Sequence, residues 1–340
     1  MNLLPHDPSI VFLYQINANY DSLAECPIFK QFLSDILVDE SLQPDKELIK
    51  IVQEFTGYCC YICCPFDKAL MFHGEGSNGK NVLLYVFDSL FKDFGSNVHF
   101  EEIGKDRFAS ADLAGKLLNV SGELSASVKL QDGEVKKIIS GERISAQRKY
   151  QKAFDFSPFA KHIVTTNNLP VTLDKSFGFF GRWKVIPFRQ TFLNAEDDQK
   201  IINEFRAKGK PYKIAAPFLE EKLVKELDGV FRWAMDGLKR LLAKKGFTYS
   251  KQIDEMRTIF QMRSSTVEAF AEGHFDTSNP TAATLLQDAY KMYVEFCEKL
   301  RFPALDDKKF AGEFRKSGYV VEPGTGNKTY IKGVMKKASQ

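Results

Sequence analysis

The 340-residue sequence lacks any apolar run near the roughly 18 residues that a membrane-spanning helix needs. Residues 1–9 also lack the basic and apolar stretches of a secretory signal. Neither sign of charge dominates, because 47 lysines and arginines stand against 44 acidic residues, and the net charge of +3 does not by itself indicate a nucleic-acid partner. The 44% of hydrophobic residues excludes a disordered or collagen-like chain. We therefore expect a globular protein with no membrane partner.

Cysteine is scarce, and its spacing provides no complete metal site. The six cysteines are at positions 26, 59, 60, 63, 64 and 297. Cys60 and Cys63 have the spacing of a zinc or redox motif, but the sequence supplies no second ligand pair. We interpret this segment as a turn of buried helix in which cysteine serves as a small apolar residue. Free thiols in this number indicate a reducing, cytoplasmic setting.

Apolar residues recur in patterns that predict alternating helices and strands. Helical spacing runs through residues 27–64, and another helix is expected from Val82 onward. Short apolar runs predict strands at residues 69–72, 116–121, 162–166 and 184–188. Strands that alternate with helices predict an α/β fold with a parallel sheet that is covered on both faces.

The C-terminal half of the sequence is expected to be largely helical. Residues 195–263 are mostly helical in pattern, most strongly at 218–242, and residues 264–281 have the Gly and Pro content of a linker. Two more helices, at 282–300 and 306–316, precede strands at 319–321 and 329–331 that flank a turn at 322–328. Two helices followed by a β-hairpin resemble the second half of a winged helix.

A glycine-rich segment lies between the first predicted strand and a predicted helix. Gly74-Glu-Gly-Ser-Asn-Gly79-Lys80 fits G-x-x-x-x-G-K, and this context indicates a phosphate-binding loop. Its backbone N–H groups face a phosphate, the helix N-terminus adds a favourable dipole, and Lys80 reaches the β- and γ-phosphates. The next residue is usually a Ser or Thr that binds magnesium, but an Asn amide oxygen can ligate Mg²⁺ directly or through water. The expected ATP-binding residues are Gly74, Gly76, Ser77, Asn78, Gly79, Lys80 and Asn81.

Three further polar residues lie at the ends of the later predicted strands. Hydrolysis of a bound nucleotide needs a carboxylate that orients water and metal, and Glu123 follows the strand at 116–121. Asn167 follows the strand at 162–166, where its amide suits the attacking water or the γ-phosphate. Arg182 precedes the strand at 184–188 and is a candidate arginine finger, with Arg189 in reserve.

Two segments concentrate positive charge. Residues 129–161, which begin at Lys129, carry eight lysines and arginines against four acids, a local charge of +4. Alternating runs at 143–147 and 153–156 predict a hairpin within this segment, and cations with one aromatic ring at its tip suit DNA that is held without reading of its sequence. A solvated charged turn is the alternative. The tip residues are Arg148, Lys149, Tyr150 and Lys152. Residues 308–340 carry +6, which suits either duplex DNA or a docking contact with another replication protein.

The order of Gly74–Asn81, Glu123, Asn167 and Arg182 resembles that of superfamily 3 helicases, most of all the helicase part of phage, plasmid and viral primase–helicases. The resemblance covers residues 25–190 and, more loosely, the tail. It implies an AAA+ P-loop NTPase core, ATP and Mg²⁺ as cofactors, a homo-hexameric ring and single-stranded DNA in the ring channel.

The resemblance also implies a role for each matching residue. Glu123 is the acid that polarises the lytic water and, with Asn81, holds Mg²⁺, either directly or through water. Asn167 is the sensor, and Arg182 reaches the γ-phosphate bound by the neighbouring subunit. A primase or polymerase domain or protein is an implied partner. The implied location is the cytoplasm of a bacterial or archaeal host or of a virus-infected cell.

Two positions depart from the family pattern, and they keep a second function open. Gly122 stands where many relatives have a first acid, and Gly181 stands where a second arginine is common. The favoured function is an ATP-dependent DNA helicase or translocase in phage, plasmid or mobile-element replication. The alternative is an ATP-switched DNA-binding initiator or scaffold without productive unwinding. A small-molecule P-loop kinase ranks third, because it gives the basic hairpin no role.

The sequence divides into four expected domains. They are a helical collar at 1–65, the AAA+ core at 66–192, a helical region at 193–265 and a winged-helix-like domain at 282–335.

Overall fold

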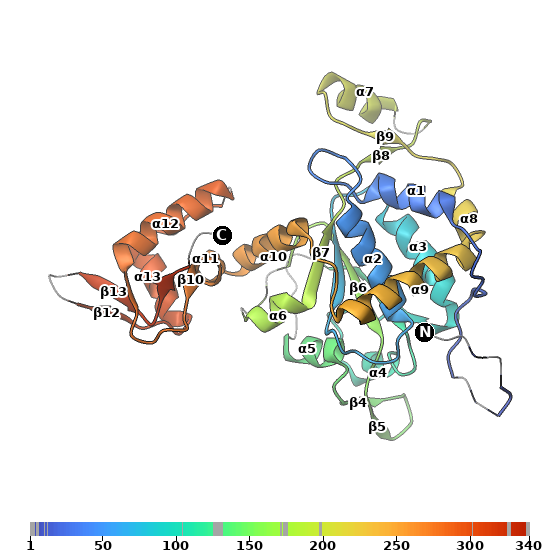
Figure 1. Ribbon diagram of the computed structural model, residues 1–340, viewed down its shortest axis with the longest axis horizontal. Coiled ribbons are helices and arrows are strands. Elements are labelled where there is room, and N and C mark those ends of the chain that lie inside the picture. The colour runs from blue at the N-terminus through green and yellow to red at the C-terminus, as the bar shows by residue number, and fades with distance from the viewer. Residues whose placement is uncertain are drawn as a thin grey trace. The chain divides into compact units, whose positions relative to one another are not determined.

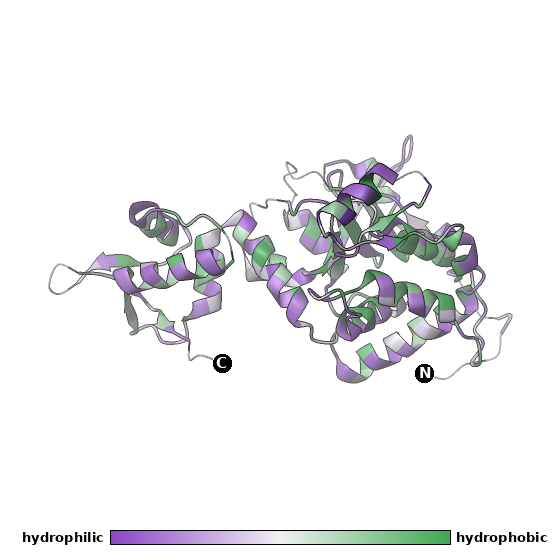
Figure 2. Ribbon diagram, turned by 90° about the horizontal axis from the view of Figure 1, so that it is seen from above, coloured by the Kyte–Doolittle hydropathy of each residue, from purple (hydrophilic) through white to green (hydrophobic). Residues whose placement is uncertain are grey.

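The computed structural model divides into two compact units. It describes residues 4, 7–9, 11, 13–103, 105–124, 132–170, 172, 176–196, 199–300, 302–324 and 328–337. The first unit consists of residues 1–170 and 181–256, and the second of residues 171–180 and 257–340. Apolar and polar residues alternate along the helices of both units (Figure 2). Within the described ranges no helix combines the length and apolar character that a bilayer span needs.

A parallel five-stranded sheet forms the centre of the first unit (Figure 1). Its strands are β1 (Ala69–His73), β2 (Gly95–Ser96), β3 (Leu118–Glu123), β6 (Lys161–Thr166) and β7 (Trp183–Pro187). The strand order is β2-β3-β6-β1-β7, so β6 separates β1 from β3. The predicted α/β fold with a parallel sheet is confirmed. Sequence patterns predict four of these strands and miss β2, because two residues are too few to show an alternation.

Helices surround this sheet. The first unit contains α1 (Pro27–Ile36), α2 (Lys46–Cys59), α3 (Lys80–Phe91), α4 (Arg107–Ala111), α5 (Asp132–Ser140), α8 (Leu219–Val224) and α9 (Leu227–Lys244), with a 3₁₀ turn at Lys92–Phe94. Helix α7 (Gln199–Ala207) lies apart from the sheet (Figure 1). Apolar residues of α1, α2, α3 and α9 form one buried cluster with residues of β1, β3, β6 and β7. Burial of this cluster supplies the main driving force for folding of the unit. Helices α6 (Phe177–Arg182) and α10 (Lys251–Ser264) cross between the two units.

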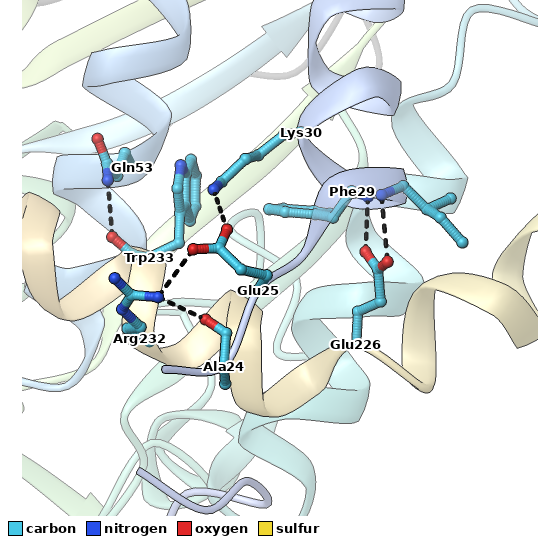
Figure 3. A network of polar contacts seen from close by, with 9 residues as sticks. Ala24, Glu25, Phe29, Lys30, Gln53, Glu226, Arg232 and Trp233 are labelled. Atoms are coloured by element: carbon cyan, nitrogen blue, oxygen red, sulfur yellow. Dashed lines mark hydrogen bonds and ion pairs between the residues drawn. The ribbon is translucent and has the colours of Figure 1, made fainter. Parts of the chain in front are cut away.

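Helices α2 and α9 approach closely because each places a glycine at their contact. A side-chain carbon on Gly57 would lie 2.3 Å from the carbonyl oxygen of Ala234, and one on Gly237 would lie 2.4 Å from that of Gln53. The backbones therefore touch where larger residues would hold them apart. The Gln53 side chain donates a hydrogen bond of 2.7 Å to the Trp233 carbonyl across the same contact (Figure 3).

Helix α1 receives its N-terminal cap from a distant part of the chain. Cys26 precedes the helix and forms no side-chain capping bond. Glu226, just before α9, instead accepts hydrogen bonds from the backbone N–H groups of Ile28 at 3.1 Å and Phe29 at 2.9 Å (Figure 3). A carboxylate at this end of a helix satisfies free N–H groups and interacts favourably with the helix dipole.

Two small strand pairs extend from the first unit. Strands β4 (Ile144–Gln147) and β5 (Ala153–Phe156) form the antiparallel hairpin that the sequence predicts. The basic residue at the start of its flanking segment, Lys129, lies outside the described residues. Strands β8 (Phe192–Leu193) and β9 (Lys213–Ile214) pair in parallel.

The second unit has its own aromatic core. Its helices are α11 (Thr266–His274), α12 (Leu286–Lys299) and α13 (Asp307–Lys316). Its strands are β10 (Phe275–Asp276), β11 (Ala283–Leu285), β12 (Val321–Pro323), β13 (Thr329–Lys332) and β14 (Met335–Lys336). The rings of Tyr293 and Phe310 lie 4.6 Å apart between centroids and are fully buried. Strands β11, β13 and β12 form an antiparallel sheet, and the pairing of β12 with β13 confirms a hairpin in this region. The strand predicted at 319–321 is placed too early, because β12 begins at Val321 and extends into the predicted turn. Residues 325–327 of that turn lie outside the described residues.

The structure corrects the interpretation of residues 264–281 as a linker. Helix α11 begins inside this range, and Ser265 caps it by accepting a hydrogen bond from the Glu268 N–H at 3.3 Å. Ser followed three residues later by Glu is a helix-start signal that outweighs Gly273 within the helix and Pro280 beyond it.

Two other helix predictions need correction. The strong helical pattern at 218–242 corresponds to two helices, α8 and α9, which are separated at Lys225 and Glu226, where the Glu226 side chain caps α1. The turn at Cys60–Cys63 is not buried helix. Helix α2 ends at Cys59, and the Cys63 side chain is exposed.

Candidate functional site

The phosphate loop joins the carboxyl end of β1 to the start of α3. Ser77 and Gly79 have positive φ angles of 55° and 85°, so the chain curls between strand and helix. A side-chain carbon on Gly79 would also lie 2.5 Å from Ile36 on α1, so both backbone and packing require glycine. With Gly79 as its N-cap, α3 begins at Lys80, two residues before the predicted start at Val82.

The Lys80 side chain turns inward along this loop and is only 7% exposed. Its Nζ donates to the carbonyl oxygens of Gly74 and Glu75, the latter at 3.2 Å, and lies 3.5 Å from Asn167 Oδ1. Burial lowers the pKa of Lys80, while the negative charge of Glu123 acts in the opposite direction.

Glu123 and Asn167 meet at the carboxyl end of the neighbouring strands β3 and β6. Asn167 Nδ2 donates a hydrogen bond of 2.6 Å to Glu123 Oε1. Because β6 lies between β3 and β1, Asn167 stands between the acid on one side and Lys80 on the other. The three sequence-predicted groups therefore form one continuous chain of polar contacts.

An open cavity of about 1100 Å³ lies beside these groups. The phosphate loop, the end of β3 and Asn167 line it, and so do α1 and residues 213–216. Apolar Ile28 and Ile214 belong to this second part of the lining, where the Lys213 ammonium forms an ion pair with Asp35. The volume is of the order found for small-molecule sites.

Asn81 and Glu123 both line the cavity with exposed side chains. Their amide and carboxylate oxygens are the ligand type that Mg²⁺ accepts together with water and phosphate oxygens. Among the residues that the structure describes, no group of three or more His, Cys, Asp or Glu side chains could hold a metal ion. The donor set here thus fits a hydrated cation brought in with a nucleotide, rather than a cage made only by protein.

Arg182 lies at the amino end of the strands, opposite the end that carries Glu123 and Asn167. It precedes β7, whose first residue Trp183 pairs with Ala69 at the start of β1, whereas the phosphate loop follows the end of β1. Five strand residues span roughly 17 Å, so the Arg182 side chain is far from its own phosphate loop. Its Nε and Nη2 donate to Ser140 Oγ at 3.3 and 3.1 Å. The reserve candidate, Arg189, donates to Gln252 instead.

The tip of the β4–β5 hairpin presents its ring and cations to solvent. Tyr150 is fully exposed and has a φ angle of 63°. The Arg148 guanidinium lies over the Phe154 ring, 5.5 Å from its centroid. Lys149 and Lys152 are also exposed. These four predicted residues lie together in the hairpin and do not line the cavity.

The part of the cavity lining from α1 and residues 213–216 was not predicted from the sequence. Ile28 and Ile214 are ordinary apolar residues that are separated by 186 positions, and no local pattern marks either of them. The Asp35–Lys213 ion pair equally joins distant segments. Only the folded chain brings these residues to the phosphate loop.

Comparisons with known proteins give similarity over parts of the chain. Residues 72–182 match a family model described as a family of unknown function, DUF5906. The chain is 26% identical over 168 residues to "Putative helicase L207/L206" of Acanthamoeba polyphaga mimivirus, which covers 47% of this chain and 18% of that protein. It is 25% identical over 203 residues to "Putative helicase 184R" of Invertebrate iridescent virus 6, which covers 56% and 21%. The chain thus spans about a fifth of the length of these curated relatives.

A solved structure shares the fold. The A-form apo structure of the NrS-1 C-terminal region superposes with a TM-score of 0.50 at 15% identity, over 94% of this chain and 79% of that chain. At this identity the match concerns the fold alone. The chain is therefore similar in fold to the NrS-1 C-terminal region and similar in sequence to two viral proteins that carry helicase names.

Proposed function

We propose that this protein is an ATP-dependent DNA helicase or translocase of viral, phage or mobile-element replication. The observation that carries the proposal is the chain of contacts from Lys80 through Asn167 to Glu123, at the edge of a cavity large enough for a nucleotide. Similarity to the two viral proteins with helicase names supports it.

Each of the three residues has a chemical task in this proposal. Lys80 exchanges the loop carbonyls that it now contacts for the β- and γ-phosphate oxygens of ATP. Glu123 accepts a hydrogen bond from the attacking water and orients it. Asn167 already contacts both groups, so it holds water and γ-phosphate in register. Asn81 and Glu123 hold Mg²⁺, directly or through water, which neutralises phosphate charge.

The position of Arg182 supports an oligomer. Within one subunit this arginine lies at the amino end of the strands and the phosphate loop at their carboxyl end. In a head-to-tail ring, different faces of adjacent subunits meet, so that Arg182 of one subunit can complete the neighbour's site. We propose an AAA+ type superfamily 3 ring, a hexamer, on this ground together with the sequence resemblance.

DNA is the proposed partner at two surfaces. The exposed ring of Tyr150 and the cations of Lys149 and Lys152 suit single-stranded DNA in a ring channel. In the second unit, Lys308 and Lys309 are exposed at the start of α13, which precedes the β12–β13 hairpin in a winged-helix-like order. That surface suits duplex DNA.

The first experiment measures ATP hydrolysis and strand displacement on forked DNA. Lys80→Ala removes the phosphate-binding ammonium, so hydrolysis should fall by about 10²–10³-fold. Lys50→Ala, an exposed lysine of α2, is the matched control and should behave as wild type. Turnover that survives Lys80→Ala would overturn the ATP site. DNA binding with ATP hydrolysis but no strand displacement would instead favour the initiator or scaffold.

A further inference from the structure

Residues 96–100 lie beside β3, and side chains of β3 form hydrogen bonds with their backbone. The buried Asn119 side chain accepts a hydrogen bond from the Val98 N–H at 2.8 Å and donates to the Val98 carbonyl at 3.0 Å. Ser121 Oγ accepts from the Phe100 N–H at 3.1 Å. His99 lies between these two anchored residues. Its side chain is exposed, and its ring nitrogens have no hydrogen-bond partner among the described residues.

Gly122 is an extra residue near the end of β3. Ser121 pairs with Val164 and Glu123 pairs with Thr165, so Gly122 has no partner in the register. Such a bulge redirects the side chain that follows it, which here is that of Glu123. Gly122 itself lines the nucleotide cavity.

The His99 ring occupies the space that a side chain at position 122 would need. A side-chain carbon built on Gly122 would lie 3.2 Å from His99 Cε1 and 3.8 Å from its Nδ1. Even alanine would therefore press on the ring, and a longer side chain would have to displace it. The glycine at the bulge and the anchored histidine are complementary in shape.

We propose that His99 is a positioning residue of the ATP site, which supplies a polar group against Gly122, the residue that precedes Glu123 and lines the cavity. This inference rests on the proposed function. A neutral imidazole has one donor and one acceptor nitrogen, so it can hold a water molecule that also contacts a carboxylate. The hydrogen bonds of Asn119 and Ser121 hold the backbone on both sides of His99 against β3, so the ring starts from a fixed position next to Gly122.

The first test separates the role of the His99 ring nitrogens from the role of the ring as a flat group that packs on Gly122. His99→Phe keeps a planar ring against Gly122 and removes both nitrogens, so kcat for ATP hydrolysis should fall by about 10–100-fold, the range for a residue that orients a reacting group. The dissociation constant of a fluorescent ATP analogue should stay within about twofold, because the phosphate loop is untouched. His99→Gln, which restores a donor and an acceptor, should recover part of the loss.

The second test asks whether positions 99 and 122 share one space. Gly122→Asp combined with His99→Ala should regain activity that His99→Ala loses, because the carboxylate then enters the vacated space. Gly122→Asp alone should be impaired. Without nucleotide, the Cε1–H NMR signal of His99, assigned by its loss in His99→Phe, should shift in Gly122→Ala.

The outcomes distinguish the two proposals. If Lys80→Ala abolishes hydrolysis while His99→Phe retains wild-type kcat, the role of His99 is overturned and the ATP site stands. An unshifted His99 signal in Gly122→Ala would equally overturn the shared space. If Lys80→Ala leaves hydrolysis intact, the proposed function itself fails, and the role of His99 fails with it.

Discussion

Among single residues, the buried histidine of β6 is unusual. His162 is 1% exposed, and within the part of the chain that the structure describes neither of its ring nitrogens has a hydrogen-bond partner. Its ring instead packs edge to face on Phe100, with centroids 5.1 Å apart. Burial lowers the pKa of His162 to about 3, and the charge of Lys161 acts in the same direction. The folded protein therefore keeps this histidine neutral.

His162 should make stability depend on pH. In the unfolded chain its pKa is near 6.5, so below that pH the unfolded state binds a proton that the folded state excludes. Stability should fall as the pH drops from 6.5 toward 3, and the loss from this group at pH 5.5 is about 1.4 kcal/mol. Urea unfolding at pH 8 and pH 5.5 measures it through fluorescence, because both tryptophans, Trp183 and Trp233, lie in the first unit.

His162→Leu is the matched variant for this measurement. It keeps an apolar contact with Phe100 and removes two polar atoms that lack partners, so its stability at pH 8 should equal or exceed that of the wild type. Its loss of stability between pH 8 and pH 5.5 should be smaller by about 1.4 kcal/mol. Equal pH dependence in the two proteins would show that His162 is protonated while folded.

At the scale of elements, the order of α1 depends on a carboxylate from another helix. Glu226 supplies the N-terminal cap, and residues of α1 in turn line the cavity. If the cavity binds the nucleotide as proposed, the stability of α1 and the affinity for nucleotide are linked through one side chain.

Glu226→Ala should destabilise the first unit by about 1 kcal/mol, the usual worth of an N-cap, and should weaken nucleotide binding because α1 frays at the cavity. The two measurements are urea unfolding and titration with a fluorescent ATP analogue. Glu221→Ala removes an exposed glutamate of α8 that has no side-chain partner within the described part of the chain, so it should change neither. Equal effects of the two variants would refute the capping role.

The β4–β5 hairpin is the element expected to contact DNA. Tyr150→Ala should weaken single-stranded DNA binding by about 1–3 kcal/mol, while Tyr150→Phe keeps the stacking ring and should bind as wild type. Lys149→Ala with Lys152→Ala should reduce the slope of log K against log salt concentration by about 1.4. Lys46→Ala with Lys50→Ala, two exposed lysines of α2, is the charge-matched control. An unchanged salt slope in the hairpin variant would exclude phosphate contacts there.

At the scale of the whole molecule, one subunit does not bring all the predicted catalytic groups together. Lys80, Asn167 and Glu123 meet at the carboxyl end of the strands, whereas Arg182 lies at their amino end and contacts Ser140 of α5. In the proposed ring, this arginine acts on the ATP that the neighbouring subunit binds.

Mixing two inactive variants should therefore restore hydrolysis. Arg182→Ala subunits keep Lys80, and Lys80→Ala subunits keep Arg182, so a random equal mixture regains competent interfaces at up to about a quarter of its sites. ATP turnover of the mixture, compared with each variant alone, measures this. Ser140→Ala removes the contact within the subunit but keeps the guanidinium, so Ser140→Ala should hydrolyse ATP as wild type. No recovery in the mixture would contradict action across an interface.

Features that depend on residues close together in the chain follow directly from the sequence. The phosphate loop, the strands that carry Glu123 and Asn167, and the β4–β5 hairpin each follow from spacing within about ten residues, where backbone geometry and the alternation of apolar side chains act directly. Ser265 and Glu268 equally mark the start of helix α11. The prediction of a linker there was wrong because it gave more weight to the Gly and Pro content of the segment than to this capping pattern.

Which of these segments come together depends on the folding of the whole chain. Placement of β6 between β1 and β3 brings Asn167 between Lys80 and Glu123, and strand order depends on packing across the whole sheet. Three other features join residues that lie 23 to 198 positions apart in the sequence. They are the cap that Glu226 supplies to α1, the place of Ile28 and Ile214 in one cavity lining, and the fit of His99 against Gly122. Burial and close packing select such partners in space, and so no local pattern in the sequence marks them.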